Sequence, residues 1–209
     1  MKTLGGIGTE RSIGSDVEQF PKARGEYDLM TPRENLGLIV SPATDVELDN
    51  TLPLMEAFFG AEIANPKIVH WVQELNRLSV WAIKDAKTGV GLGCYSQLFL
   101  SPLGKELAEK DQLDARTPQR DWLASSEEPP AAVYKWLMVA RGRAFGGIPM
   151  VASFMRQPRF AKLDYFAGAL TPSGADFLER YGFEKISPGA RTYRYERLAN
   201  RAPLQEMAS

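Results

Sequence analysis

The stretch AVYKWLMVARGRAFGG, residues 132–147, decides how the rest of the 209-residue chain is interpreted. Its first nine residues form an almost continuous apolar run, which is typical of a strand buried on both faces of a sheet. The next seven residues contain three glycines and two arginines, and Pro149 then suits the first turn of a helix over residues 150–156. Backbone N–H groups and the helix dipole can hold a phosphate where a strand, a glycine-rich loop and a helix start follow one another.

Positive charge gathers in the same region, although the whole chain has 25 Lys and Arg against 26 Asp and Glu. Residues 129–163 contain no acidic residue and six basic ones, so we expect an anionic ligand there. The alternative is a buried strand followed by solvated arginines. The loop matches neither the nucleoside-triphosphate loop nor the dinucleotide-binding fingerprint, which argues against a kinase and a dehydrogenase. The six basic residues are Lys135, Arg141, Arg143, Arg156, Arg159 and Lys162.

Strand and helix patterns on both sides of this stretch predict one mixed α/β domain over residues 36–198, with a mostly antiparallel central sheet flanked by helices. Residues 1–35 are expected to form a mobile arm, residues 101–130 a polar insertion and residues 199–209 a tail. Strands are expected at 36–40, 78–84, 90–100, 132–140, 163–170, 183–186 and 192–197. Helices are expected after Thr44, from Pro66, and at 102–110, 150–156 and 173–181. Pro53 is expected to break the first helix or to restart it at Thr51.

Composition excludes several classes of protein. The single cysteine, Cys94, excludes an internal disulfide, and with one histidine, His70, the chain cannot supply four Cys and His ligands to a structural zinc. No metal is therefore expected. No uncharged run is apolar enough to span a bilayer, and the near-zero net charge gives no reason to expect nucleic acid. The N-terminus has no basic-then-apolar leader, which favours the cytoplasm.

Two motifs in the expected order resemble those of the GCN5-related N-acetyltransferase superfamily. The first is Arg141-x-x-Ala144-x-Gly146, and the second is Phe177 to Phe183, in which Leu178 stands where the superfamily often has a tyrosine. The resemblance implies an acyl-CoA N-acyltransferase-like fold, acetyl-CoA or another acyl thioester as co-substrate, and loop amides that bind its pyrophosphate. In the superfamily this tyrosine often protonates the leaving thiolate, and Leu178 cannot take that role. The implied cofactor-binding residues are Met138, Val139, Arg141, Gly142, Arg143, Ala144, Phe145, Gly146 and Gly147.

A narrower group of motifs is similar to the toxin-activating lysine acyltransferases. They include Cys94-Tyr95-Ser96 and Thr171-Pro172, separated by an insertion. This resemblance implies an acyl carrier protein as donor and a protein lysine as acceptor. The catalytic histidine of that family has no counterpart at the matching spacing. Acetyl-CoA and a carrier-bound acyl group both stay open as donors, and a small molecule or a protein as the amine acceptor.

Acyl transfer to an amine needs a neutral amine, a polarised thioester carbonyl and a proton for the leaving thiolate. A backbone N–H near Met138 could polarise the carbonyl. For proton transfer we select Tyr134 and then His70, with Tyr181 and Ser96 as further candidates. The structural alternatives are a packed Tyr134, a surface pair between His70 and Glu74, and Cys94 as an inert buried thiol. The alternative to an enzyme is a regulatory protein of the same fold that binds acyl-CoA without catalysis.

Overall fold

The computed structural model describes residues 37–60, 64–140 and 142–196. The predicted N-terminal arm, the first residue of the predicted domain (Leu36) and the predicted tail lie outside these ranges. Within the described part of the chain, no helix has both the length and the apolar composition needed to cross a membrane.

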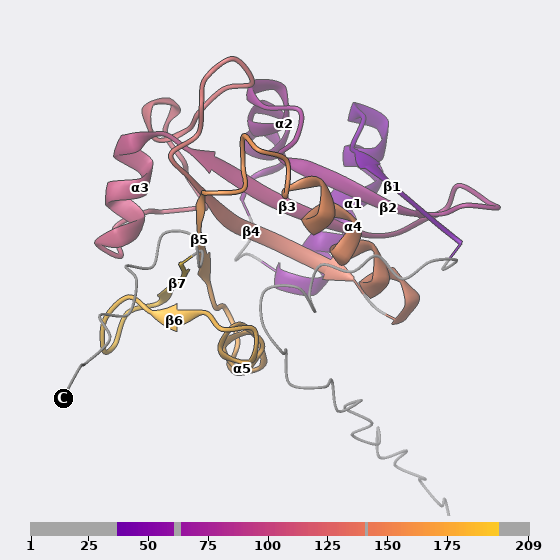
Figure 1. Ribbon diagram of the computed structural model, residues 1–209. Helices are drawn as coiled ribbons and strands as arrows, with labels where there is room; N and C mark the ends of the chain where they lie inside the picture. The colour runs from indigo at the N-terminus through magenta and orange to yellow at the C-terminus, as the bar shows by residue number, and fades with distance from the viewer. Residues whose placement is uncertain (1–36, 61–63, 141, 197–209) are drawn as a thin grey trace, which may run out of the picture.

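The strands of the described residues form one sheet in the order β1-β2-β3-β4-β5-β7-β6 (Figure 1). Each neighbouring pair is antiparallel except β4 and β5, which are parallel. The predicted mixed, mostly antiparallel sheet is therefore confirmed. The strands are β1 (Leu38–Pro42), β2 (Val80–Asp85), β3 (Gly91–Leu100), β4 (Ala132–Ala140), β5 (Asp164–Gly168), β6 (Glu184–Lys185) and β7 (Thr192–Tyr195).

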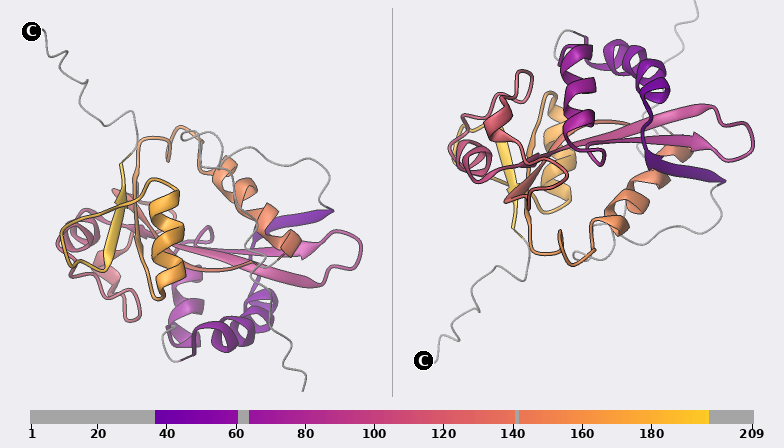
Figure 2. Two further views of the ribbon diagram at one scale, coloured as in Figure 1. Left: turned by 90° about the horizontal axis from the view of Figure 1, so that it is seen from below. Right: turned by 90° about the horizontal axis from the view of Figure 1, so that it is seen from above.

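Helices cover both faces of the sheet (Figure 2). α1 and α2 lie on one face, where they pack with α3 around strand residues such as Leu137 and Tyr134. α4 and α5 lie on the other face, against residues such as Tyr95 and Val133. The helices are α1 (Asp45–Phe59), α2 (Pro66–Leu75), α3 (Pro102–Glu109), α4 (Ile148–Phe154) and α5 (Pro172–Arg180), with short 3-10 turns η2 (Arg120–Trp122) and η3 (Gly142–Gly147).

α1 begins after Thr44, as the sequence predicts, but it continues through Pro53, where a break was expected. The Glu47 backbone N–H donates to the Thr44 side chain, and the Glu47 carboxylate accepts from the Thr44 backbone N–H at 2.8 Å, which is a capping box. The expected break at Pro53 is wrong, because one helix runs through it. Leu48 before the proline and Met55 after it are both fully buried against the sheet. Burial on both sides of Pro53 offsets the roughly 3 kcal/mol that a proline costs inside a helix.

The polar insertion, residues 101–130, folds onto the sheet. It carries α3, which confirms the helix predicted over 102–110, and Ala108 on that helix is fully buried. The Asp111 carboxylate accepts the backbone N–H of Thr192 at 3.0 Å, which holds the insertion to the start of β7. The segment is therefore an integral layer of the domain at the end of the sheet.

An extra residue in β4 bends this strand in the middle of the sheet. Ser96 of β3 is opposite Leu137, but the next residue, Gln97, is opposite Lys135, so Trp136 has no partner on β3. This is a β-bulge, which increases the local bend and twist. On its other edge β4 pairs with β5 only from Ala132 to Lys135, although β4 itself continues to Ala140. The sheet is therefore split between β4 and β5 beyond the bulge.

Candidate functional site

An apolar pocket of about 160 Å³ occupies the split between β4 and β5. Its walls come from β3, from β4 on both sides of the bulge, and from the segment that runs from the end of β5 through α5. Most of its lining is hydrophobic or aromatic, with a few polar groups, which is the usual character of a small-molecule site. The lining residues are Tyr95, Ser96, Lys135, Trp136, Leu137, Met138, Ile148, Ala167, Gly168, Ala169, Leu170, Thr171, Gly174, Phe177, Leu178, Tyr181 and Phe183.

The bulge turns one backbone amide toward the pocket. The Ser96 hydroxyl accepts the Leu137 backbone N–H at 3.0 Å and donates to the Leu137 carbonyl at 3.0 Å, so both backbone groups of Leu137 point toward β3. Amide directions alternate along a strand, so the N–H of the next residue, Met138, points toward the split. β5 does not reach this part of β4. We infer that this amide faces the space between the strands, and its contact with a ligand carbonyl stays a prediction.

Lys135 is the only charged residue among the described residues that line the pocket. It is paired with Ala167, the last residue of β5 that pairs with β4, so it stands where the two strands part. Its Nζ lies 5.9 Å, 5.7 Å and 5.2 Å from the ring centroids of Tyr95, Tyr165 and Phe183. These distances lie within the range of cation–π attraction. The pocket therefore combines apolar walls with one positive charge at the apex of the split.

The predicted pyrophosphate loop lies beside this pocket and does not line it. The segment Gly142–Gly147 forms η3 and leads directly into α4. The Phe145 ring meets Phe177 edge-on, with centroids 6.1 Å apart, and Phe177 lines the pocket. Of the described residues predicted to bind coenzyme A, Met138 alone lines the pocket, while Val139 packs toward α1 on the other face. The loop borders the rim of the pocket through Phe145.

Two residues of this loop have structural roles of their own. The Arg143 guanidinium forms an ion pair with the Asp85 carboxylate at the end of β2. A side chain at Gly147 would lie 2.8 Å from a methyl carbon of Ile83, so the glycine allows close packing on β2. Arg141 lies outside the described residues. Binding of a pyrophosphate by this loop stays a prediction.

The basic residues of the acid-free run point to different places. Lys135 lies in the pocket and Arg143 is at the hairpin between β2 and β3. The Arg159 guanidinium carbon lies 4.3 Å from the centroid of the Phe160 ring. These three side chains do not form one basic surface.

The two residues selected for proton transfer lie outside the lining of the pocket. Tyr134 is buried on the face covered by α2 and α3, and burial raises the pKa of Tyr134 to about 12. His70 is on α2, where its Nε2 lies 2.9 Å from the Asp49 carboxylate of α1. The expected pairing of His70 with Glu74 is wrong, because the histidine faces the neighbouring helix. Neither residue is part of the pocket lining.

The further candidates from the sequence, Ser96 and Tyr181, do line the pocket. The Tyr181 ring packs on Phe177 one helical turn earlier, with centroids 4.4 Å apart. Leu178, which stands where the resemblance implies a tyrosine, also lines it and presents no proton donor. Lys135 was not among the residues selected for proton transfer. The signal that could have identified it is the single charge inside the apolar run of residues 132–140.

Cys94 has the inert character expected of it. It is fully buried in β3, and burial raises the pKa of the Cys94 thiol to about 12. At neutral pH this thiol is protonated and unreactive.

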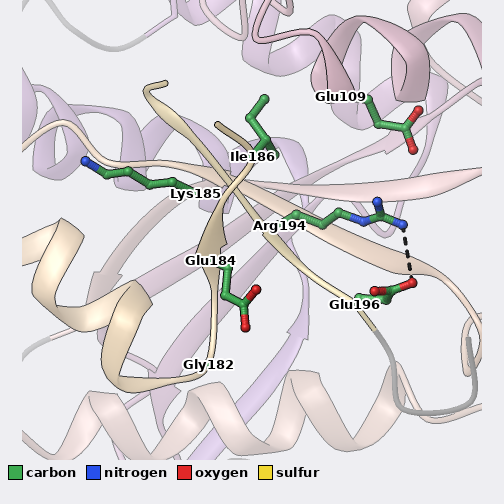
Figure 3. A pocket seen from close by; sticks show the side chains of 7 residues that line it. All are labelled: Glu109, Gly182, Glu184, Lys185, Ile186, Arg194 and Glu196. Atoms are coloured by element: carbon green, nitrogen blue, oxygen red, sulfur yellow. Dashed lines mark ion pairs between the residues drawn. The ribbon is translucent and has the colours of Figure 1, made fainter. Parts of the chain in front are cut away.

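A second, larger hollow of about 660 Å³ lies beside β6 and β7 (Figure 3). Its side chains are mostly charged, and Arg194 takes part in several ion pairs. Arg194 lies 3.7 Å from Glu196 and 2.8 Å from the buried Asp164, which is also 3.4 Å from Lys105 of α3. These pairs join α3, β5 and β7. We interpret this polar cleft as the outer surface of a structural ion-pair network, and the apolar pocket as the candidate site. The lining residues of the cleft are Glu109, Gly182, Glu184, Lys185, Ile186, Arg194 and Glu196.

Comparison with known proteins finds no matching family model and no matching curated protein. Similar solved structures do exist. A proposed phosphinothricin N-acetyltransferase matches with a TM-score of 0.49 and 12% identity over 77% of this chain and 98% of that one. A histone acetyltransferase HPA2 and related acetyltransferase from Corynebacterium glutamicum matches with a TM-score of 0.43 and 14% identity over 80% and 99% of the two chains. An acetyltransferase of the GNAT family from Listeria monocytogenes matches with a TM-score of 0.43 and 14% identity over 77% and 94%.

Proposed function

We propose that this protein is an N-acyltransferase, which moves an acyl group from a thioester donor to an amine acceptor. The observation that carries the proposal is the split between β4 and β5, which opens an apolar pocket beside an available backbone amide. The acyl-pantetheine arm of a donor is long, narrow and mostly apolar, and carries amide groups that need hydrogen-bond partners. Such an arm suits a pocket between two parting strands.

The Met138 amide supplies the chemistry that a thioester needs at its carbonyl. When an amine attacks, negative charge develops on the carbonyl oxygen, and an oriented N–H in a water-poor pocket stabilises that charge. The walls formed by α5 and the aromatic side chains exclude water, which would otherwise hydrolyse the donor. Acetyl-CoA, a longer acyl-CoA and an acyl carrier protein share this thioester arm.

The donor's phosphates are assigned to the rim formed by η3, next to Phe145 and Arg143. Arg143 is half exposed even though it pairs with Asp85, so it can contribute charge to an incoming phosphate. The toxin-activating type of reaction, with a protein lysine as acceptor, is the narrower form of the proposal. A small-molecule amine is the other acceptor class.

The second candidate function is a protein that binds acyl-CoA without catalysis. Leu178 favours it, because an apolar side chain lines the pocket at the position where the resemblance implies a proton donor. The two functions differ in one product, the free thiol.

The test combines binding with turnover. We expect coenzyme A to raise the melting temperature, because a ligand that binds only the folded state stabilises it by mass action. Arg143→Gln should reduce this shift, while Arg116→Gln, which removes an exposed pair with Asp114, should not. Release of free thiol from acetyl-, octanoyl- or palmitoyl-CoA that depends on an added amine supports the enzyme. Binding without such release supports the non-catalytic protein, and absence of both contradicts the proposal.

A further inference from the structure

The position of Lys135 defines a role within the proposed reaction. It is the last residue of β4 that pairs with β5, and the bulge begins at the next residue. A donor whose arm lies in the split must bring its thioester to this apex, next to the Met138 amide. The one charged side chain of the described lining is therefore next to the reacting group.

We propose that the Lys135 ammonium stabilises the departing thiolate of the donor and gives it a proton, and this inference rests on the acyltransferase function proposed above. An ammonium interacts more strongly with a developing anion in an apolar pocket than in water, because the effective dielectric constant is lower. Leu178 presents no proton at the pocket wall, and the Tyr134 hydroxyl is outside the lining.

The aromatic surroundings keep this lysine suited to an acid role rather than to acceptance of the acyl group. The rings of Tyr95, Tyr165 and Phe183 attract the charged form through their π faces. Only the uncharged amine is nucleophilic, so the same rings oppose acylation of Lys135 itself. Tyr181 also lines the pocket, but its neutral phenol brings no positive charge to the sulfur.

The step balances in atoms and charge. The acceptor amine attacks the carbonyl carbon, a C–N bond forms and the C–S bond breaks with its electron pair on sulfur. The Lys135 ammonium gives one proton to that sulfur and becomes an amine. The nitrogen of the new amide loses one proton, which returns through water to Lys135. The products are an amide and a free thiol, and Lys135 ends as an ammonium.

The first experiment compares Lys135→Met with a matched control. Lys185→Met is that control, because Lys185 also lies over an aromatic ring, 5.6 Å from the centroid of Tyr193, but lines the polar cleft. With the acyl-CoA that the wild type uses, we expect kcat to fall by roughly 100-fold or more in Lys135→Met and to stay unchanged in Lys185→Met. The dissociation constant of coenzyme A, measured by calorimetry, should change by less than about threefold in both variants, which is a small change in binding free energy.

The second experiment varies the leaving group. Two minimal donors with the same acyl group are used, an N-acetylcysteamine thioester and a thiophenyl thioester. An aryl thiolate leaves without help from an acid, so Lys135→Met should lose roughly 100-fold with the first donor and less than about tenfold with the second. Lys135→Arg keeps the charge but does not release a proton, so it should retain part of the activity with the first donor.

The outcomes separate the two proposals. Equal losses with both donors, or full activity of Lys135→Met, contradict the acid role while the wild type stays an active acyltransferase. An acyl group found on Lys135 by mass spectrometry of the wild type after incubation with acyl-CoA also contradicts it. A wild type without turnover of any donor contradicts the acyltransferase function and, with it, this inference.

Discussion

The apolar pocket and the polar cleft lie toward opposite ends of β5 and use charge in opposite ways. At the first residue of the strand, the Asp164 carboxylate is buried between two cations, Lys105 and Arg194, and the charges satisfy one another. At the far end, past Ala167, Lys135 lies among aromatic rings in a pocket whose described lining contains no acid. The charges at the start of β5 pair with one another and stabilise the fold, whereas the charge of Lys135 lies beside the space that a ligand would occupy. The smaller, apolar pocket is therefore the candidate site, and the larger polar cleft is not.

The largest expected effect is a loss of stability when the ion-pair network behind the polar cleft is disrupted. Asp164→Ala removes a buried carboxylate and leaves Lys105 and Arg194 facing each other, so we expect a loss of about 3 kcal/mol of unfolding free energy. This is the lower end for breaking a buried ion pair, because both cations reach solvent. Urea unfolding measures it. Glu196→Gln is the control, since its exposed contact with Arg194 at 3.7 Å should contribute less than about 0.5 kcal/mol.

Asp164→Ala also tests whether the polar cleft takes part in donor binding. At a temperature where Asp164→Ala stays folded, its affinity for coenzyme A should match that of the wild type, because the network lies outside the pocket. A variant that stays stable but loses donor binding would reverse our assignment of the two hollows.

Local sequence patterns predicted much of the fold, because the signals are local. The helix start after Thr44 and the apolar run that forms β4 each depend on a few neighbouring residues. The continuity of α1 through Pro53 was not predictable from that pattern. It depends on burial against strands that are remote in the sequence.

The candidate site was predicted less well, because it depends on pairing between distant segments. The bulge at Trp136 exists only relative to the register of β3, and the split exists only relative to the length of β5. The partners of His70 and Arg143 were not predictable for the same reason, because they are distant in the sequence. His70 pairs with Asp49 and Arg143 with Asp85, residues that lie 21 and 58 positions away in the sequence.

An intermediate effect is expected at the wall of the pocket. A methyl group at Gly168 would lie 2.6 Å from the Tyr134 hydroxyl, so Gly168→Ala should cost roughly 1–3 kcal/mol of unfolding free energy through overpacking. Tyr134→Phe removes that hydroxyl. The double variant should therefore be more stable than the sum of the two single effects predicts.

Turnover of Tyr134→Phe then decides between two roles of this tyrosine. Because its hydroxyl packs behind Gly168 and outside the lining of the pocket, we expect thiol release to stay within about threefold of the wild type, far from the roughly 100-fold that a lost proton donor costs. A fall of that larger size would return the proton-transfer role to Tyr134 and remove it from Lys135.

The smallest expected effect concerns the ion pair between Arg143 and Asp85, which holds the rim of the pocket, and this effect disappears in acid. The backbone N–H and hydroxyl of Thr88, followed by Arg143 and Lys87, lower the pKa of Asp85 from an ordinary 3.8 to about 2. A carboxylate with a lowered pKa stabilises the folded state fully above its unfolded pKa, and this contribution disappears as the pH falls through the folded pKa. The wild type should therefore be more stable than Asp85→Asn at pH 5, and the difference should shrink steadily between about pH 4 and pH 2. Urea unfolding across this range measures it, with Asp45→Asn as the control, because the Asp45 carboxylate is 71% exposed in its pair with Arg77. A difference between wild type and Asp85→Asn that persists unchanged to pH 2 would show that Asp85 holds η3 by packing and not by its charge.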